Sequence, residues 1–310
     1  MTSPRGGALL VLGDIVTDIV ARHGAPLAPG TDTAAVIRTV PGGAGANVAC
    51  WAAARGCGDV RMLGRVGADA AAWHEEALTR AGVRPRLVVD SEAPTGTVIC
   101  LVDGGVGGRA ERTFLSDGGA SVRLSEADWS ADLLDGVGWL HLSGYLFFAG
   151  ASRAAAAAAL AAARARGVPV SVDPASAGFL AGLGAKRFLA AVEGVEVLLP
   201  SAGEARFLAG AAAGVTELSG LTEAAGALSR RFPAVVVKRG PAGALVATGG
   251  KVRAEVPAPR AAARDSTGAG DAFTGAFLAA RLGGAGLCEA SAEGCRAGAR
   301  AVELVGGRPG

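Results

Sequence analysis

Short apolar runs that recur along the chain, each followed by a stretch with helical periodicity, most strongly constrain the fold. The runs are continuously apolar rather than alternating, which is typical of strands buried on both faces of a parallel sheet. The helix pattern SRAAAAAALAAARARG ends in arginines followed by Gly167, a helix C-terminal signal. Strands that alternate with helices in this way predict an α/β protein with a parallel sheet between helical layers. The expected strands lie in residues 8–14, 60–67, 138–144, 168–174, 195–200 and 234–240.

Two segments, 14–42 and 95–117, interrupt this alternation with strand patterns and Pro or Gly turns and no helix pattern. We expect them to form a small antiparallel sheet that projects from the main one. Such a sheet is either a plain excursion at the edge or a lid that keeps water from the chemistry. The predicted division is a core of 1–13, 43–94 and 118–310 and a β lid of 14–42 and 95–117.

Composition restricts the partners and the compartment. The 310 residues are 50% hydrophobic and 19% charged with a net charge of +2, which predicts a folded chain without a nucleic-acid partner. The longest alanine-rich run, 154–163, is shorter than the ~20 residues that a membrane helix needs, and the N-terminus lacks a signal-peptide pattern. Five cysteines without a CxxC pair predict core packing and a cytoplasmic location.

The motif DSTGAGDAFTG, residues 265–275, is the strongest local signal for chemistry. Its glycines open a helix whose first amides have no intrahelical acceptor, so this end favours phosphate. Asp271 falls in the first turn, where its carboxylate can accept a proton from a substrate hydroxyl. The alternative is that Asp271 only complements the helix dipole.

Two further motifs lie near the N-terminus. In PGGAGANVA, residues 41–49, glycines permit close backbone approach to a ligand, and Asn47 can bind sugar hydroxyls or merely cap the helix. In GDIVTD, residues 13–18, Asp18 can accept hydrogen bonds from hydroxyl pairs or simply occupy a turn.

Several well-known nucleotide-binding and hydrolytic patterns fail on spacing. The third place of a GxGxxG fingerprint is taken by Phe273 in one glycine motif and by Val48 in the other. The sequence contains no GxxxxGK[ST], HExxH or GxSxG. These observations argue against an NAD-dependent dehydrogenase and a Walker A loop.

Taken together, the three motifs resemble those of the PfkB or ribokinase family of carbohydrate kinases, over essentially the whole chain. The resemblance implies a Rossmann-like three-layer core with a β-sheet lid and ATP-dependent phosphorylation of a sugar or nucleoside hydroxyl. It implies that Asp271 is the catalytic base. The implied anion hole is Gly268, Ala269 and Gly270, and the implied sugar-binding positions are Asp18, Gly43 and Asn47. Because the helix end favours an ionised carboxylate, we expect Asp271 to be a weak base.

The resemblance also suggests nucleotide and metal positions. LLPSAGEARFL is similar to the family's NxxE magnesium motif, with Glu204 in place to order metal-bound water and Ser201 where asparagine is usual. KRGPAG is similar to its nucleotide loop. The implied ATP contacts are Lys238, Gly240, Gly243 and Ser201, and the implied monovalent cation site, usually for potassium, contains Asp265 and Thr267.

The substrate stays open between a sugar or sugar-like alcohol, which we favour, and a nucleoside. Ribokinases have a motif similar to GGKGAN, and Ala44 occupies the lysine position of that pattern in this chain. The motif therefore departs from that of ribokinases. Among aromatic side chains that could stack on a base, Trp51 and Phe114 are expected in the core, whereas Tyr145 is undecided. The lid arginines Arg109 and Arg112 are expected to solvate a hairpin tip.

Two further classes of protein would share part of this pattern. A vitamin kinase would keep GAGD but lack GGxGAN and the paired lid segments, and a catalytically silent sugar-binding protein would be expected to lose Asp271. Exposed lid strands would leave unprotected sheet edges, so a homodimer through the lid is plausible.

Overall fold

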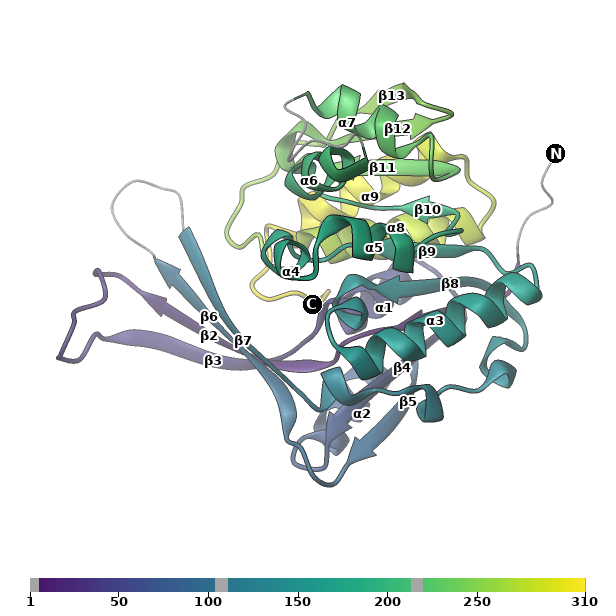
Figure 1. The fold of residues 1–310 in the computed structure, drawn as a ribbon. Helices are drawn as coiled ribbons and strands as arrows, with labels where there is room; N and C mark the ends of the chain where they lie inside the picture. The colour runs from purple at the N-terminus through teal and green to yellow at the C-terminus, as the bar shows by residue number, and fades with distance from the viewer. Residues whose placement is uncertain (1–5, 104–110, 213–219, 310) are drawn as a thin grey trace.

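Residues 6–103, 111–212 and 220–309 are described by the computed structural model of the chain (Figure 1). Within them, the larger sheet has the strand order β13-β12-β11-β10-β9-β8-β1-β4-β5. The neighbouring strands β5-β4-β1-β8-β9-β10-β11 are all parallel. Strands β12 and β13 extend the sheet beyond β11 as an antiparallel hairpin. Its strands are β1 (Ala8–Leu12), β4 (Val60–Gly67), β5 (Val83–Asp90), β8 (Val137–Ser143), β9 (Val170–Asp173), β10 (Val197–Leu198), β11 (Ala234–Lys238), β12 (Ala244–Thr248) and β13 (Lys251–Val256).

Helices cover both faces of this sheet. One face carries α3 (Gly150–Ala165), α4 (Ala177–Leu183), α5 (Ala185–Ala191), α6 (Ala202–Ala212) and α7 (Leu221–Leu228). The other carries α1 (Ala44–Ala54), α2 (Ala71–Arg80), α8 (Ala269–Leu282) and α9 (Leu287–Ala301). The predicted three-layer α/β core is therefore confirmed.

Strand β1 explains why the apolar runs are continuous. Leu10 and Leu12 pack into the core beneath α3–α7, whereas Leu9 and Val11 pack into the core beneath α1, α2, α8 and α9. Successive side chains of a strand point to opposite faces, so a strand covered on both sides buries the side chains of both its faces. Each of these four side chains is 0% exposed.

A second sheet, with the order β3-β2-β6-β7, projects from the core on the left of Figure 1. Its strands are β2 (Val16–His23), β3 (Ala35–Gly42), β6 (Thr95–Asp103) and β7 (Glu111–Gly119). The β2–β3 and β6–β7 pairs are antiparallel, but β2 and β6 pair in parallel, so the sheet is mixed rather than wholly antiparallel as predicted. The sheet is continuous with the core through β1 and α1; treating it as a separate lid domain stays a prediction.

The connections reverse direction between β1 and β8. From β1 the chain builds β4 and β5 on one side, and β8 through β11 extend the sheet on the other. Ligands of open α/β sheets bind at such a switch point, outside the carboxyl ends of the strands. The GDIVTD motif, which follows β1, lies there. Within the described residues, no helix has the length and apolarity to cross a membrane.

Candidate active site

The N-terminus of α8 forms the centre of the site. Gly268 precedes the helix with a φ of 72°, in the left-handed region that favours glycine, and a methyl group there would collide with the backbone of Gly307. The Ala269 amide donates to the Ser266 carbonyl at 3.3 Å. The amides of Gly270 and Asp271 follow in the first turn, where helix geometry supplies no acceptor, so they remain available to an anion.

Asp271 meets Asn47 of α1 at this helix end. Asn47 Nδ2 donates to Asp271 Oδ2 at 2.9 Å. Burial raises the pKa of Asp271 to about 7, and Asp173 contributes to the rise, although the hydrogen bond from Asn47 acts to lower it. The expectation of a weak base is therefore corrected: burial outweighs the helix dipole, and the carboxylate is a stronger base than an ordinary aspartate.

Arg308, near the C-terminus, extends the hydrogen-bond network of Asn47 and Asp271. None of the three sequence motifs includes this arginine. Its Nε donates to Asn47 Oδ1 at 3.4 Å, and its Nη2 donates to the Gly42 carbonyl at 3.0 Å. Burial lowers its pKa. Trp51 Nε1 donates to the preceding Gly307 carbonyl at 2.9 Å and so fixes the C-terminal segment on α1.

Asp18, on β2, lies beside this arginine. Burial, and then the Asp14 carboxylate, raise the pKa of Asp18 to about 7, while Arg308 opposes the shift. The carboxylate covers Gly42, where any side chain would collide with it. Asp18 therefore lies close to Gly42 and Arg308, and through Arg308 to Asn47.

Asp14, which the sequence motifs did not single out, holds the loop in place. Its Oδ2 accepts the Ala44 amide at 2.7 Å, and its Oδ1 accepts the Ser143 hydroxyl at 2.7 Å. The bonds tie the end of β1 to the start of α1 and to the end of β8. Gly43 has a φ of 98°, and a Cβ there would lie 2.5 Å from the Asp14 carbonyl oxygen, so this turn requires glycine.

A charged cluster lies at the ends of β9 and β11. Asp173 Oδ2 accepts hydrogen bonds from Lys238 Nζ and, at 2.9 Å, from the hydroxyl of Thr274 on α8. Burial acts to lower the pKa of Lys238, but Asp173 and Glu204 together hold it above its usual value. A Cβ on Gly270 would lie 3.5 Å from Lys238 Nζ, which places this ammonium beside the α8 N-terminus.

Glu204 and Ser201 form the N-terminal cap of α6. Glu204 Oε2 accepts the Ser201 amide at 2.8 Å, and the Ser201 hydroxyl accepts the Glu204 amide at 3.4 Å. Burial, and then Asp173, raise the pKa of Glu204. The carboxylates of Glu204 and Asp173 lie close together in a buried site. Mg²⁺ prefers such oxygen ligands and usually completes its coordination with phosphate and water. In the described part of the chain no group of three or more His, Cys, Asp or Glu side chains forms a protein-only metal site.

The two glycines of KRGPAG differ in surroundings. A Cβ on Gly243 would collide with the Val256 carbonyl of β13, so the fold itself requires glycine there. Around Gly240, by contrast, the described atoms leave open space within 4 Å. The nucleotide contact proposed for both remains a prediction.

Asp265, which precedes the α8 loop, forms an ion pair with strand β7 of the smaller sheet. Arg112 Nη2 lies 2.8 Å from Asp265 Oδ1, and Arg112 also donates to the Ser266 hydroxyl. The Arg112 side chain is only 13% exposed. The expectation that it solvates a hairpin tip is wrong, because β7 returns toward the core and brings the guanidinium to a buried carboxylate. Arg109 lies outside the described residues.

The aromatic side chains divide differently from the prediction. Trp51 is 3% exposed in the core as expected, but Phe114 is 51% exposed on β7, so the core assignment of Phe114 is wrong. Tyr145 packs edge to face on Phe148 and on Phe179, with centroid distances of 6.0 and 5.8 Å. Burial, and then the Asp14 and Asp271 carboxylates, raise the pKa of Tyr145.

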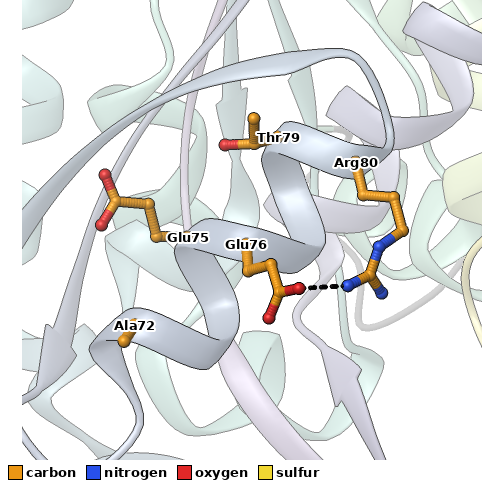
Figure 2. Close-up of a pocket in the computed structure, with 5 residues that line it drawn as sticks. All are labelled: Ala72, Glu75, Glu76, Thr79 and Arg80. Carbon is orange, nitrogen blue, oxygen red and sulfur yellow. Dashed lines mark hydrogen bonds and ion pairs between the residues drawn. The ribbon is translucent and has the colours of Figure 1, made fainter.

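A separate depression of about 500 Å³ lies on α2, lined by Ala72, Glu75, Glu76, Thr79 and Arg80 (Figure 2). Arg80 and Glu76 form an exposed ion pair there, 2.5 Å apart. All of its lining residues come from one helix, and none belongs to the network around Asp271.

The chain is similar to known proteins over nearly its whole length. A family model described as pfkB family carbohydrate kinase matches residues 8–310. An adenosine kinase from Sinorhizobium meliloti has a similar structure, with a TM-score of 0.85 at 21% identity, covering 98% of this chain and 96% of that one. A ribokinase from Thermotoga maritima has a TM-score of 0.80 at 26% identity, covering 97% and 94%. An E. coli ribokinase II candidate in complex with ATP and Mg²⁺ has a TM-score of 0.81 at 24% identity, covering 97% and 94%.

Proposed function

Because the chain belongs to the pfkB family of carbohydrate kinases, we propose that it transfers the γ-phosphoryl group of ATP to a hydroxyl of a sugar or sugar-like alcohol. The observation that carries this proposal is the meeting of Asp271 and Asn47 at the N-terminus of α8. A base, a hydrogen-bond partner that orients it and unsatisfied amides are found at one helix end. Phosphoryl transfer needs little more than positioning and charge stabilisation.

In this mechanism Asp271 accepts the proton of the attacking hydroxyl. Its raised pKa, about 7, suits a base that works near neutral pH. Asn47 Nδ2 binds one carboxylate oxygen and leaves the other for the substrate. The amides of Gly270 and Asp271 bind the charge that develops on the transferred group.

Asp18 and Asn47 bind the other hydroxyls of the substrate, and Gly43 allows the sugar ring to approach the backbone. Arg308 orients this pocket, since it holds the Asn47 amide oxygen and lies beside Asp18. The resulting pocket offers acceptors and donors to a polyhydroxylated molecule.

The nucleotide lies on the other side of α8, where Lys238 binds its phosphates. Gly240, Gly243 and Ser201 line the remainder of the nucleotide site, and Gly268 and Ala269 form the turn that presents the free amides of α8 as the anion hole. Mg²⁺, when bound with ATP, neutralises phosphate charge, and Glu204 with Asp173 would hold it through water. The buried pair of carboxylates supports this assignment.

A nucleoside is the second candidate substrate. Tyr145, Phe148 and Phe179 form a cluster in which Phe148 and Phe179 stack at 5.2 Å, and Phe179 is 44% exposed. Tyr145 interacts electrostatically with Asp271, so this cluster borders the catalytic end and offers rings on which a base can stack.

The test is an ATP-consumption screen over pentoses, hexoses, sugar acids and nucleosides, with Asp271→Asn as the matched control. Turnover of a sugar by the wild type but not by Asp271→Asn supports the proposal. Turnover restricted to nucleosides favours the second candidate. Binding of a sugar without turnover would show a silent sugar-binding protein and overturn the kinase assignment.

We also propose that the lid sheet pairs with a second copy and that the enzyme works in the cytoplasm, where ATP is supplied. The edge strands β3 and β7 expose Val36, Ile37, Phe114 and Leu115, each more than half accessible. Exposed apolar sheet edges invite pairing. A dimer in light scattering that Ile37→Lys converts to monomer supports this interface; a monomeric wild type would refute it.

A further inference from the structure

The buried carboxylate of Asp265 has three protein donors. Oδ1 accepts the Thr267 amide at 2.9 Å and the Arg112 guanidinium at 2.8 Å. Oδ2 accepts the Gly306 amide at 3.1 Å. The residue is 1% exposed. A buried carboxylate is costly unless its charge is matched, and here the matching charge arrives from the lid.

A monovalent cation, which the family resemblance assigns to Asp265 and Thr267, fits this arrangement poorly. The single negative charge is already paired with Arg112, and a second cation beside the guanidinium would be repelled. The backbone carbonyl of Val302, in the C-terminal segment, is also engaged already. It accepts the amides of Arg264 at 2.7 Å and Asp265 at 3.0 Å. The Thr267 hydroxyl is buried without a hydrogen-bond partner among the described residues, but it is a neutral ligand without a free charge beside it.

We propose that Arg112 supplies at Asp265 the positive charge that a potassium ion would otherwise supply, so that this kinase works without a monovalent cation. The inference rests on the proposed function for its catalytic consequence, but the charge replacement itself is a property of the folded protein. Arg112 is a positioning residue, since it reaches the reacting atoms only through other groups.

The path from Arg112 to the anion hole is short. Arg112 binds both Asp265 and Ser266, and the Ser266 carbonyl accepts the Ala269 amide of α8. Asp265 in turn holds Gly306, and the next residue, Gly307, packs against Gly268. Loss of the guanidinium would leave a buried charge unpaired and loosen the loop that presents the first amides of α8.

The lid is part of this device. Arg112 lies on β7, and its ion pair joins the small sheet to the loop before α8. A free ion would neutralise Asp265 whether or not the lid is near. A lid arginine does so only when β7 is in place, so the charge at the anion-hole loop depends on the position of the lid.

The first experiment measures thermal unfolding of the full chain in potassium chloride and in choline chloride at equal ionic strength. We expect the wild type to unfold at the same temperature in both salts. Arg112→Ala should unfold at a lower temperature than the wild type in choline chloride. Potassium should specifically raise the unfolding temperature of this variant, because Asp265 and Thr267 are then free to bind the ion. Arg38→Ala, at an exposed arginine of lid strand β3, is the control and should show no potassium effect. A potassium-specific rise in the wild type would overturn the proposal, whatever the substrate of the enzyme.

The second experiment measures turnover with whichever substrate the screen identifies. We expect wild-type kcat to agree within twofold between the two salts. Arg112→Ala should lose at least tenfold in choline and regain most of that loss in potassium, whereas Arg112→Lys, which keeps the charge, should stay indifferent to potassium. A wild type activated fivefold or more by potassium, or a loss in Arg112→Ala that potassium does not restore, would overturn the proposal. If Arg112→Ala fails to fold, the wild type and Arg112→Lys decide it.

Discussion

Asn47 and Asp271 are separated by 224 residues, yet Asn47 Nδ2 lies 2.9 Å from Asp271 Oδ2. The contact joins α1, which follows strand β3 of the smaller sheet, to α8, whose N-terminus is the proposed anion hole. One side chain therefore connects the proposed sugar-binding loop to the proposed base. The same amide accepts Arg308 through its oxygen, so its orientation is fixed from both ends.

Asp271→Asn should lower kcat by roughly 10²- to 10⁴-fold, the usual contribution of a general base, while the sugar still binds. Asparagine keeps the size of the side chain and loses only the ability to take a proton. Steady-state kinetics and calorimetric titration with the sugar check the two halves. A variant with near-normal kcat would rule out Asp271 as the base.

The pH profile should show that two carboxyl groups must ionise. Asp271 and Asp18 both have pKa values raised to about 7, so each is increasingly protonated as the pH falls below 7. The logarithm of kcat/KM should then fall with a slope approaching two on the acid side. In Asp18→Asn, with a lower overall rate, the slope should become one. A slope of one in the wild type would mean that only one of these carboxyls must be charged.

Stability should respond to pH at Asp271 with the opposite sign to activity. A carboxyl whose pKa is raised on folding stabilises the folded state when protonated, and this contribution is lost as the pH rises through the folded value of about 7. Asparagine cannot ionise, so the Asp271→Asn variant does not lose stability in this way as the pH rises. The melting temperature of Asp271→Asn relative to wild type should therefore increase from about pH 4 to 7 and level off above. A difference independent of pH would show that Asp271 is not desolvated in solution.

The main sheet could be predicted because its central strands are mostly apolar, β1 at every position. Strand β5 is absent from the predicted set, since VRPRLVVD alternates exposed arginines with half-buried residues and contains Pro85, a pattern that only a sheet edge tolerates. β5 pairs with β4 alone. Edge position is a property of the assembled sheet, which a local pattern does not report.

The site shows the same division between local and long-range information. Glycine turns and the first-turn Asp271 are local features, and the sequence indicated them directly. Arg112 meets Ser266 across 154 residues and Arg308 meets Asn47 across 261. An arginine looks the same in sequence whether it is solvated or paired with a buried group, so only the chain path distinguishes the two.

Arg308→Met should raise KM for the sugar by about tenfold and lower kcat less, because the arginine holds Asn47 and the Gly42 carbonyl but not the base. A hydrogen bond to a charged group contributes roughly 1.5–3 kcal/mol, about 10- to 150-fold in affinity. Methionine fills similar volume without the charge. Because Arg308 acts to lower the pKa of Asp18, the acid limb of kcat/KM should also move to higher pH in this variant. Arg300→Met, at an exposed position of α9 where Arg300 pairs with Glu303, is the matched control and should change neither quantity. An unchanged KM together with an unchanged acid limb would show that Arg308 only packs the C-terminal segment and does not shape the substrate pocket.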